Sequence, residues 1–350
     1  MTDSPAPAPS PLGRSITWLV AFVVWALWAW AMQDGNRWGL FRTEYYMSIT
    51  MVFGAFIAGA TSEGGGAVAF PVMTLIFAIQ PVVARDFSLM IQSVGMGAAA
   101  LTILMGGIPI ERRAAVWASL GGAIGVLIGI EYVAPLLQPK FAKMTFLSIW
   151  LSFAFALYWI NRHQDREVRE SIEHFGARHG VLLVGTGLIG GIVSGITGSG
   201  LDILTFSLLV LRFRICERIA TPTSVVLMGL NAIIGFAWRG GVRGQLSPDA
   251  WNFWWVCVPI VVVCAPMGAR FIRNKSRLFV AAILYASIGI QFVAGLIIIK
   301  QTTALLLYSA AVFATGLFLF NRMAAGGVRR LEWLASHPEG GLTPPNHPRQ

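Results

Sequence analysis

Long apolar runs fill most of the chain, and short clusters of polar and charged residues separate them. A run of about 20 apolar residues can cross the hydrocarbon core of a membrane as a single helix. Runs of this kind predict spanning helices at 84–105, 114–137, 144–160, 217–238, 251–271 and 278–299. The pattern therefore predicts an all-α polytopic membrane protein.

Two further apolar stretches are interrupted by glycine-rich breaks. The piece before the break, the break and the piece after it are 44–61, 62–66 and 67–79 in the first stretch and 180–197, 198–202 and 203–211 in the second. Glycine costs about 1 kcal/mol relative to alanine in a helix interior, so a helix should stop at each break. The piece after each break is too short to cross the membrane comfortably. Each stretch is therefore predicted to form a broken helical hairpin, which is either re-entrant or crosses twice.

The two halves of the chain match each other at an offset of 136 residues. Ten of 44 positions are identical between 54–97 and 190–233. The glycine and polar matches include the pairs Gly64/Gly200, Thr61/Thr197 and Ser88/Ser224. Irregular backbone at membrane depth is tolerated only where it is buried in protein or lines a cavity. An internal repeat with paired broken helices is typical of secondary transporters, whose substrate site lies where the broken helices meet.

The distribution of basic residues predicts the topology. If neither hairpin produces a net crossing, 18 of the 26 Lys and Arg residues fall on the side of the N-terminus, which predicts that both chain ends are cytoplasmic. The same count requires an odd number of crossings in each repeat, so the two repeats should be inverted relative to each other. The predicted segments are a disordered tail at 1–15, an extra transmembrane helix at 16–32, repeat 1 at 44–160, a cytoplasmic loop at 161–179, repeat 2 at 180–299, an extra transmembrane helix at 302–321 and a cytoplasmic tail at 322–350. Each repeat thus comprises a broken hairpin followed by three spanning helices. A signal peptide is the alternative for 16–32, because Ala29-Trp30-Ala31 is similar to a cleavage site.

Composition supports this class and narrows the chemistry. The chain is 56% hydrophobic and only 12% charged, whereas soluble domains carry about 25% charged residues. The net charge is +10, and the basic residues lie between the apolar runs. They are therefore interpreted as topology signals of a protein in a lipid bilayer, and we expect no nucleic-acid partner. All five histidines are expected in polar loops or the tail, at positions 163, 174, 179, 337 and 347.

The same residues argue against catalysis. Without a histidine in an apolar segment, the sequence favours neither a cofactor such as haem nor a metal site. The Gly198-Ser199-Gly200 motif is similar to that of a serine protease, but no histidine or lysine within a predicted spanning segment could serve as its base. We therefore expect no catalytic residues and no enzyme activity.

The residues around the two breaks resemble a known family. The segment Gly59-Ala60-Thr61-Ser62-Glu63-Gly64-Gly65-Gly66, followed by Phe70-Pro71 and by 84–88, is similar to the hallmark of the TauE/SafE sulfite exporter family, also called the TSUP permeases. The segment 195–200 with 220–224 is similar to the second hallmark, and the resemblance covers about 45–300. It implies a bacterial inner-membrane permease for small, mostly sulfur-containing anions such as sulfite and sulfonates. This chain departs from the family by adding an acid at each break, Glu63 and Asp202.

The helices that follow the breaks suggest how an anion would be held. A helix N-terminus presents unpaired backbone N–H groups and the positive end of its dipole, which together bind oxyanions. The candidate substrate-binding residues are Thr61, Ser62, Gly64, Gly65, Gly66, Ser88, Gln92, Thr197, Gly198, Ser199, Gly200 and Ser224. Under the alternative interpretation, the glycines only allow close helix packing and the hydroxyls bond back to their own helices.

The two acids suggest proton coupling. Ionised carboxylates at Glu63 and Asp202 would repel an anion, and burial favours the protonated form, so the acid could take up a proton before the anion binds. Asp202 has a second interpretation as a cap for the helix that it opens. Arg85 and Asp86, at the start of a spanning helix, are expected to form a charge pair at the membrane interface. The functional alternatives are a carrier of another small carboxylate anion, or a channel or assembly partner without a transport cycle.

Overall fold

The computed structural model describes residues 11–61, 64–161, 168–272 and 277–336. In the first half the helices are α1 (Pro11–Asp34), α2 (Leu40–Thr43), α3 (Tyr45–Ala60), α4 (Gly65–Pro71), η1 (Val72–Ile76), α5 (Pro81–Met105), α6 (Arg112–Ile128), η2 (Gly129–Val133), η3 (Ala134–Leu136) and α7 (Pro139–Asn161). In the second half they are α8 (Ala177–Thr197), α9 (Leu201–Ser207), η4 (Leu208–Arg212), α10 (Glu217–Phe236), η5 (Ala237–Val242), α11 (Pro248–Ile272), α12 (Arg277–Ile298) and α13 (Thr303–Ser336). The described ranges are therefore all-helical apart from one isolated bridge, between Arg169 and Ile215.

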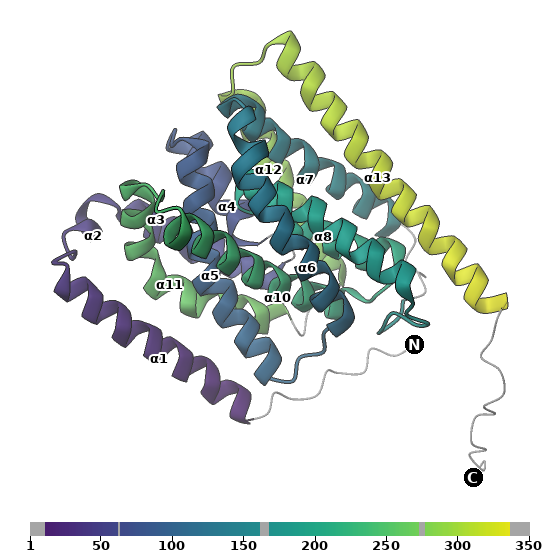
Figure 1. The fold of residues 1–350 in the computed structure, drawn as a ribbon, viewed down its shortest axis with the longest axis horizontal. Helices are drawn as coiled ribbons and strands as arrows, with labels where there is room; N and C mark the ends of the chain where they lie inside the picture. The colour runs from purple at the N-terminus through teal and green to yellow at the C-terminus, as the bar shows by residue number, and fades with distance from the viewer. Residues whose placement is uncertain (1–10, 62–63, 162–167, 273–276, 337–350) are drawn as a thin grey trace.

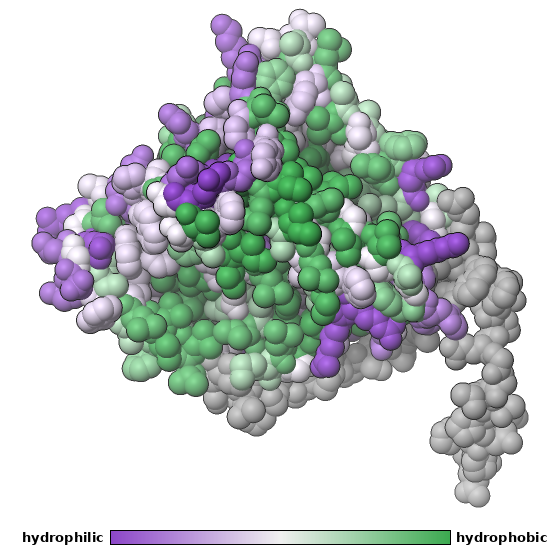
Figure 2. Space-filling model, viewed as in Figure 1, coloured by the Kyte–Doolittle hydropathy of each residue, from purple (hydrophilic) through white to green (hydrophobic). Residues whose placement is uncertain are grey.

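The chain is a multi-pass membrane protein. Seven helices of the described ranges are long and apolar enough to cross a membrane: Pro81–Met105, Arg112–Leu136, Pro139–Trp159, Ala177–Thr197, Glu217–Val242, Pro248–Phe271 and Thr303–Val328. Apolar side chains also cover much of the face shown in Figure 2. Because water would not solvate such a surface favourably, it suits contact with lipid.

Each broken stretch folds as an antiparallel hairpin. In the first, the ring of Tyr46 at the start of α3 lies 4.6 Å from the ring of Phe77, which follows η1. In the second, the ring of His179 at the start of α8 lies 5.7 Å from the ring of Phe213, which follows η4. Both hairpins therefore end close to where they begin, as expected of a broken helical hairpin, whether it is re-entrant or crosses twice.

The two hairpins have the same local structure at the offset of 136 residues found in the sequence. Helices α4 and α9 each have seven residues and begin 136 positions apart, and a five-residue π-helix follows each of them. Positive φ angles recur at the same offset, at Gly64 (74°) and Gly200 (153°) and again at Ala78 (55°) and Arg214 (58°). The repeat therefore extends to the sign of φ at individual positions, which apolar composition alone would not produce.

Contacts between the long helices define their directions. Helix α3 runs parallel to α11, since Ser48 bonds to the carbonyl of Val256 and Gly59 lies against Ala265. Helix α8 runs parallel to α6 in the same way. Helices α5 and α10 are antiparallel, because Gly229 contacts the backbone of Met96 whereas Gly235 contacts Leu89.

Glycines allow the close contact between α6 and α8. Three glycines at intervals of four residues line each side of the contact, namely Gly121 and Gly125 of α6 with Gly129 at the start of η2, and Gly187, Gly191 and Gly195 of α8. A Cβ atom on Gly191 would lie 2.8 Å from the backbone nitrogen of Val126, and one on Gly195 would lie 2.6 Å from that of Ile130. The backbones touch with no side chain between them, as small residues permit in membrane bundles.

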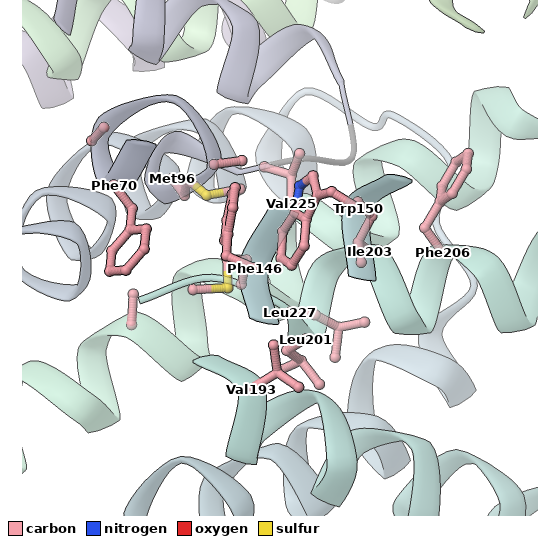
Figure 3. Close-up of a cluster of buried hydrophobic side chains, with 14 of the residues drawn as sticks. Phe70, Met96, Phe146, Trp150, Val193, Leu201, Ile203, Phe206, Val225 and Leu227 are labelled. Carbon is pink, nitrogen blue, oxygen red and sulfur yellow. The ribbon is translucent and has the colours of Figure 1, made fainter. Parts of the chain in front are cut away.

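Aromatic and aliphatic side chains fill the centre of the bundle (Figure 3). Phe146 and Trp150 of α7 stack with ring centroids 4.1 Å apart, and Phe70 of α4 packs 5.5 Å from Phe146. The two extra helices lie at opposite edges of the bundle, α1 against α5 and α11, and α13 against α7 and η4 (Figure 1).

Several helix ends differ from the sequence prediction. Helix α13 continues to Ser336 instead of ending near residue 321, and Gly326 and Gly327 in its extension lie against Arg212 and Arg214. Packing therefore stabilises a polar continuation that hydropathy does not indicate. Helix α8 begins at Ala177 and α7 at Pro139, so His179 and Lys143 lie in helices where we expected loops. Residues 11–15 of the predicted disordered tail at 1–15 lie in α1, and residues 1–10 and 337–350 of the two predicted tails lie outside the described residues.

Candidate functional site

The two glycine breaks meet inside the bundle. A Cβ atom on Gly66 would lie 3.0 Å from the carbonyl oxygen of Gly198 and 3.0 Å from the Cβ of Ser199. A Cβ atom on Gly64 would lie 2.8 Å from the hydroxyl of Ser199. Gly64 and Gly198 also have positive φ angles of 74° and 85°, which glycine adopts at no steric cost. The tips of the two hairpins are therefore in direct contact, and only glycine fits between them.

The second break is organised by the Asp202 carboxylate. Its Oδ1 accepts the N–H groups of Gly200 and Ile203, each at 3.0 Å, and its Oδ2 accepts the hydroxyl of Ser199 at 3.1 Å. The side chain is fully buried. Asp202 thus occupies backbone donors at the start of α9, as the capping interpretation predicts, although Gly200 is the N-cap residue itself.

Gln92 of α5 bridges the two tips. Its Nε2 donates to the carbonyl of Ser88 at 2.9 Å and to the carbonyl of Gly198 at 2.7 Å. The same side chain lies beside Gly64, Gly65 and Gly66 of the first break. One long helix of the first half therefore holds the tip of the second hairpin.

Most of the predicted hydroxyl ligands bond within their own helices. Thr61, Ser88 and Ser224 donate to the carbonyls of Ile57, Ala84 and Thr221 at 2.7–2.9 Å. Thr197 donates to the carbonyl of Val193 at 3.1 Å and to that of Ser199 at 2.8 Å. This is the back-bonding of the alternative interpretation. It leaves the oxygen lone pairs able to accept a further hydrogen bond.

The structure brings only part of the predicted set together. Gly64, Gly66, Gln92, Gly198 and Ser199 meet at the tips, and Ser88 contacts Gly198. Ser224 is buried on α10, where its hydroxyl bonds within that helix. Ser62 and Glu63 lie outside the described residues. Glu63 is one of the two acids in the predicted proton coupling.

Sequence reasoning missed Ser194, which accepts the N–H of Leu201 at 3.0 Å and so completes the start of α9. Seven residues separate the two in sequence, and the hairpin fold brings them together. Among the described residues, no three His, Cys, Asp or Glu side chains are grouped so that they could hold a metal ion.

The charge pair of Arg85 and Asp86 exists, and it is buried within the protein. Arg85 donates to Asp86 Oδ1 at 2.7 and 2.9 Å, and Arg239 of η5 donates to Asp86 Oδ2 at 2.8 Å. Arg85 and Asp86 are 4% and 1% exposed. The cluster therefore joins the start of α5 to the end of α10, a partner that sequence spacing did not indicate.

A multi-span bundle in which two broken hairpins meet at buried polar groups defines the class of secondary membrane transporters. The sequence model of the family described as "Sulfite exporter TauE/SafE" matches residues 47–292. The chain therefore belongs to the TauE/SafE family of membrane transporters, which confirms the resemblance and the expectation that it is not an enzyme. No curated protein and no solved structure matches the chain.

Proposed function

We propose that this transporter moves small sulfur-containing anions, such as sulfite or organosulfonates, across the inner membrane, and that the anion binds where the two hairpin tips meet. The observation that carries the proposal is the contact of Gly64 and Gly66 with Gly198 and Ser199 in a chain of the TauE/SafE family. Because the tips are broken helices at a repeat junction, they are the expected place for a carried substrate.

The proposal includes an inverted arrangement of the two repeats. Helix α3 runs with α11 and α5, helix α8 runs with α6 and α10, and α5 is antiparallel to α10. These directions support hairpins that enter from opposite faces of the membrane. With the excess of basic residues in one set of loops, they also support a cytoplasmic location for both termini.

An anion at the tips would be held by backbone and hydroxyl groups instead of an arginine. The start of α4 at Gly65 presents backbone N–H groups, and Ser199 offers a hydroxyl from the opposite tip. The tips are closed on each other, so substrate binding requires one repeat to move relative to the other. Proton uptake at Glu63 and Asp202 would offset the charge of the anion as the tips close around it.

Uptake by proteoliposomes tests the proposal. We expect accumulation of sulfite or sulfoacetate that is accelerated by an inward proton gradient and absent in empty liposomes. Preference for small carboxylates over sulfur anions would favour the alternative carrier. Flux of every small anion without saturation would indicate a channel, and no flux of any anion would indicate an assembly partner.

A further inference from the structure

Two acceptor oxygens face the same small volume beside Gly64. Asp202 Oδ2 and Gln92 Oε1 both lie within 2.8 Å of the position that a side chain on Gly64 would take. Gln92 is 1% exposed, and its Oε1 atom is buried without a hydrogen-bond partner. A buried acceptor left unsatisfied destabilises the folded state. This volume therefore lacks one proton donor.

The orientation of the Gln92 amide follows from its other contacts. Its Nε2 atom donates to two carbonyl oxygens, those of Ser88 and Gly198. Carbonyl oxygens only accept hydrogen bonds, so turning the amide over would place two pairs of acceptors against each other. The carbonyl oxygen of Gln92 must therefore point toward the Asp202 side of the junction.

We propose that Asp202 carries a proton on Oδ2 in this conformation and that this O–H group donates a hydrogen bond to Gln92 Oε1. The proposal rests on the proposed function at the same junction. It adds the atom that carries the proton and the residue that accepts the hydrogen bond from it. Oδ1 remains free to accept the N–H groups of Gly200 and Ile203. Gln92 is then a positioning residue, because its amide oxygen accepts this hydrogen bond while its amide nitrogen holds the carbonyl of Gly198.

The arrangement links proton release to separation of the tips. When the proton leaves Oδ2 for water, a carboxylate oxygen faces the carbonyl oxygen of Gln92. The repulsion displaces the Gln92 amide, which weakens its bond to Gly198 and with it the attachment of the second hairpin to α5. Protonation of Asp202 therefore stabilises the closed junction.

The surrounding elements place few other charges near this pair. On α5 the ionisable residues are Arg85 and Asp86, which pair with each other. Within the described residues, α4 has no ionisable side chain, α8 has none after His179, and α10 has none after Arg218. Glu63 precedes Gly64 in sequence, so the experiment is carried out in both the native and the Glu63→Gln background.

Thermal unfolding of the purified full-length chain in nanodiscs, from mildly acidic to mildly alkaline pH, tests the pair without requiring transport. We expect Gln92→Leu to lower Tm more at acidic than at alkaline pH, because the Asp202 proton bond exists only when the acid is protonated. In an Asp202→Asn background the cost of Gln92→Leu should not vary with pH, since the Asn amide donates at every pH. Gln291→Leu is the matched control, because Gln291 Oε1 is also buried without a partner but lies on α12. Its cost should not vary with pH.

A second variant covers the case in which Gln92→Leu does not fold. Gln92→Glu places two carboxyl groups at the same volume, so one proton is retained to higher pH. The fall in Tm of this variant should therefore move to more alkaline pH than that of the wild type.

Two results would overturn the proposal. If Gln92→Leu lowers Tm equally at every pH, Gln92 accepts no hydrogen bond from a protonated Asp202. Its role is then limited to the bond that holds Gly198. A rise in Tm on replacing choline by sodium ions, lost in Asp202→Asn, would assign the volume to sodium instead of a proton. A chain that shows the expected pH-dependent coupling but transports no anion would contradict the proposed function and leave this pair standing.

Discussion

Gly66 of the first hairpin and Gly198 of the second are in backbone contact, so that a single added carbon on Gly66 would lie 3.0 Å from the Gly198 carbonyl oxygen. They are 132 residues apart in sequence, and each belongs to a different half of the chain. Through this contact the two glycine breaks form a single junction. It also means that the junction tolerates no side chain.

We predict that Gly66→Ala impairs transport. The added methyl would meet the Gly198 carbonyl and the Gln92 amide nitrogen, 2.8 Å away, so the tips must separate. Overpacking of this kind costs typically about 1–3 kcal/mol. Uptake by proteoliposomes and Tm of the purified chain measure the two effects. Gly185→Ala is the control, because nothing lies within 4 Å of that position and alanine favours the helix. Wild-type uptake by Gly66→Ala would show that the tips are not the working site.

The buried ion cluster should contribute more to stability than the exposed one. Asp86→Asn leaves Arg85 and Arg239 facing each other without a carboxylate, and removing one partner of a buried pair costs about 3–5 kcal/mol. Glu131→Gln breaks the pair with Arg243, which is 45% exposed, and should cost much less because solvent screens the charges. Denaturation of both variants in the same detergent compares them. Equal losses would mean that burial does not distinguish the two clusters.

The contact of α6 with α8 should fail when a side chain is inserted. Gly191→Val places a branched side chain where the backbone nitrogen of Val126 would lie 2.8 Å from its Cβ, so the helices must move apart. We expect a loss of folded, monodisperse protein on size-exclusion chromatography and a lower Tm. Gly289→Ala on α12 has no neighbour within 4 Å and serves as the control. A normal elution profile for Gly191→Val would contradict the close packing.

The indole of Trp150 should matter for its ring and not for its N–H group. Trp150 is buried and stacks on Phe146, and its Nε1 atom has no hydrogen-bond partner. Trp150→Ala should therefore cost about 3–5 kcal/mol, whereas Trp150→Phe keeps an aromatic ring and should cost much less. Chemical denaturation measures both values. If Trp150→Phe were as damaging as Trp150→Ala, the N–H group would have to donate a bond that matters.

Several features could be predicted from sequence because they depend on local composition. The apolar runs predicted the spanning helices, because a helix that crosses the membrane needs about 20 consecutive apolar residues. Gly198 ends α8 and Gly64 precedes α4, and both adopt positive φ angles that glycine permits. The offset of 136 residues was visible because the two hairpins keep identical residues, such as Gly64 and Gly200, at matching positions.

Other features depended on contacts between distant segments. Arg239 completes the cluster of Asp86, and Gln92 holds Gly198, although more than 100 residues separate each pair. The extension of α13 to Ser336 is held by its packing against Arg212 and Arg214. None of these leaves a periodic signal along the chain.

For this transporter, the sequence by itself determined the membrane class, the two breaks and their repetition, because helix length and backbone conformation are set by neighbouring residues. Only the tertiary structure decided that the breaks touch and that one oxygen of Gln92 is left without a donor. Those facts depend on where separate helices pack. Hydrogen-bond satisfaction in a buried site is fixed by the surrounding atoms and not by the order of residues.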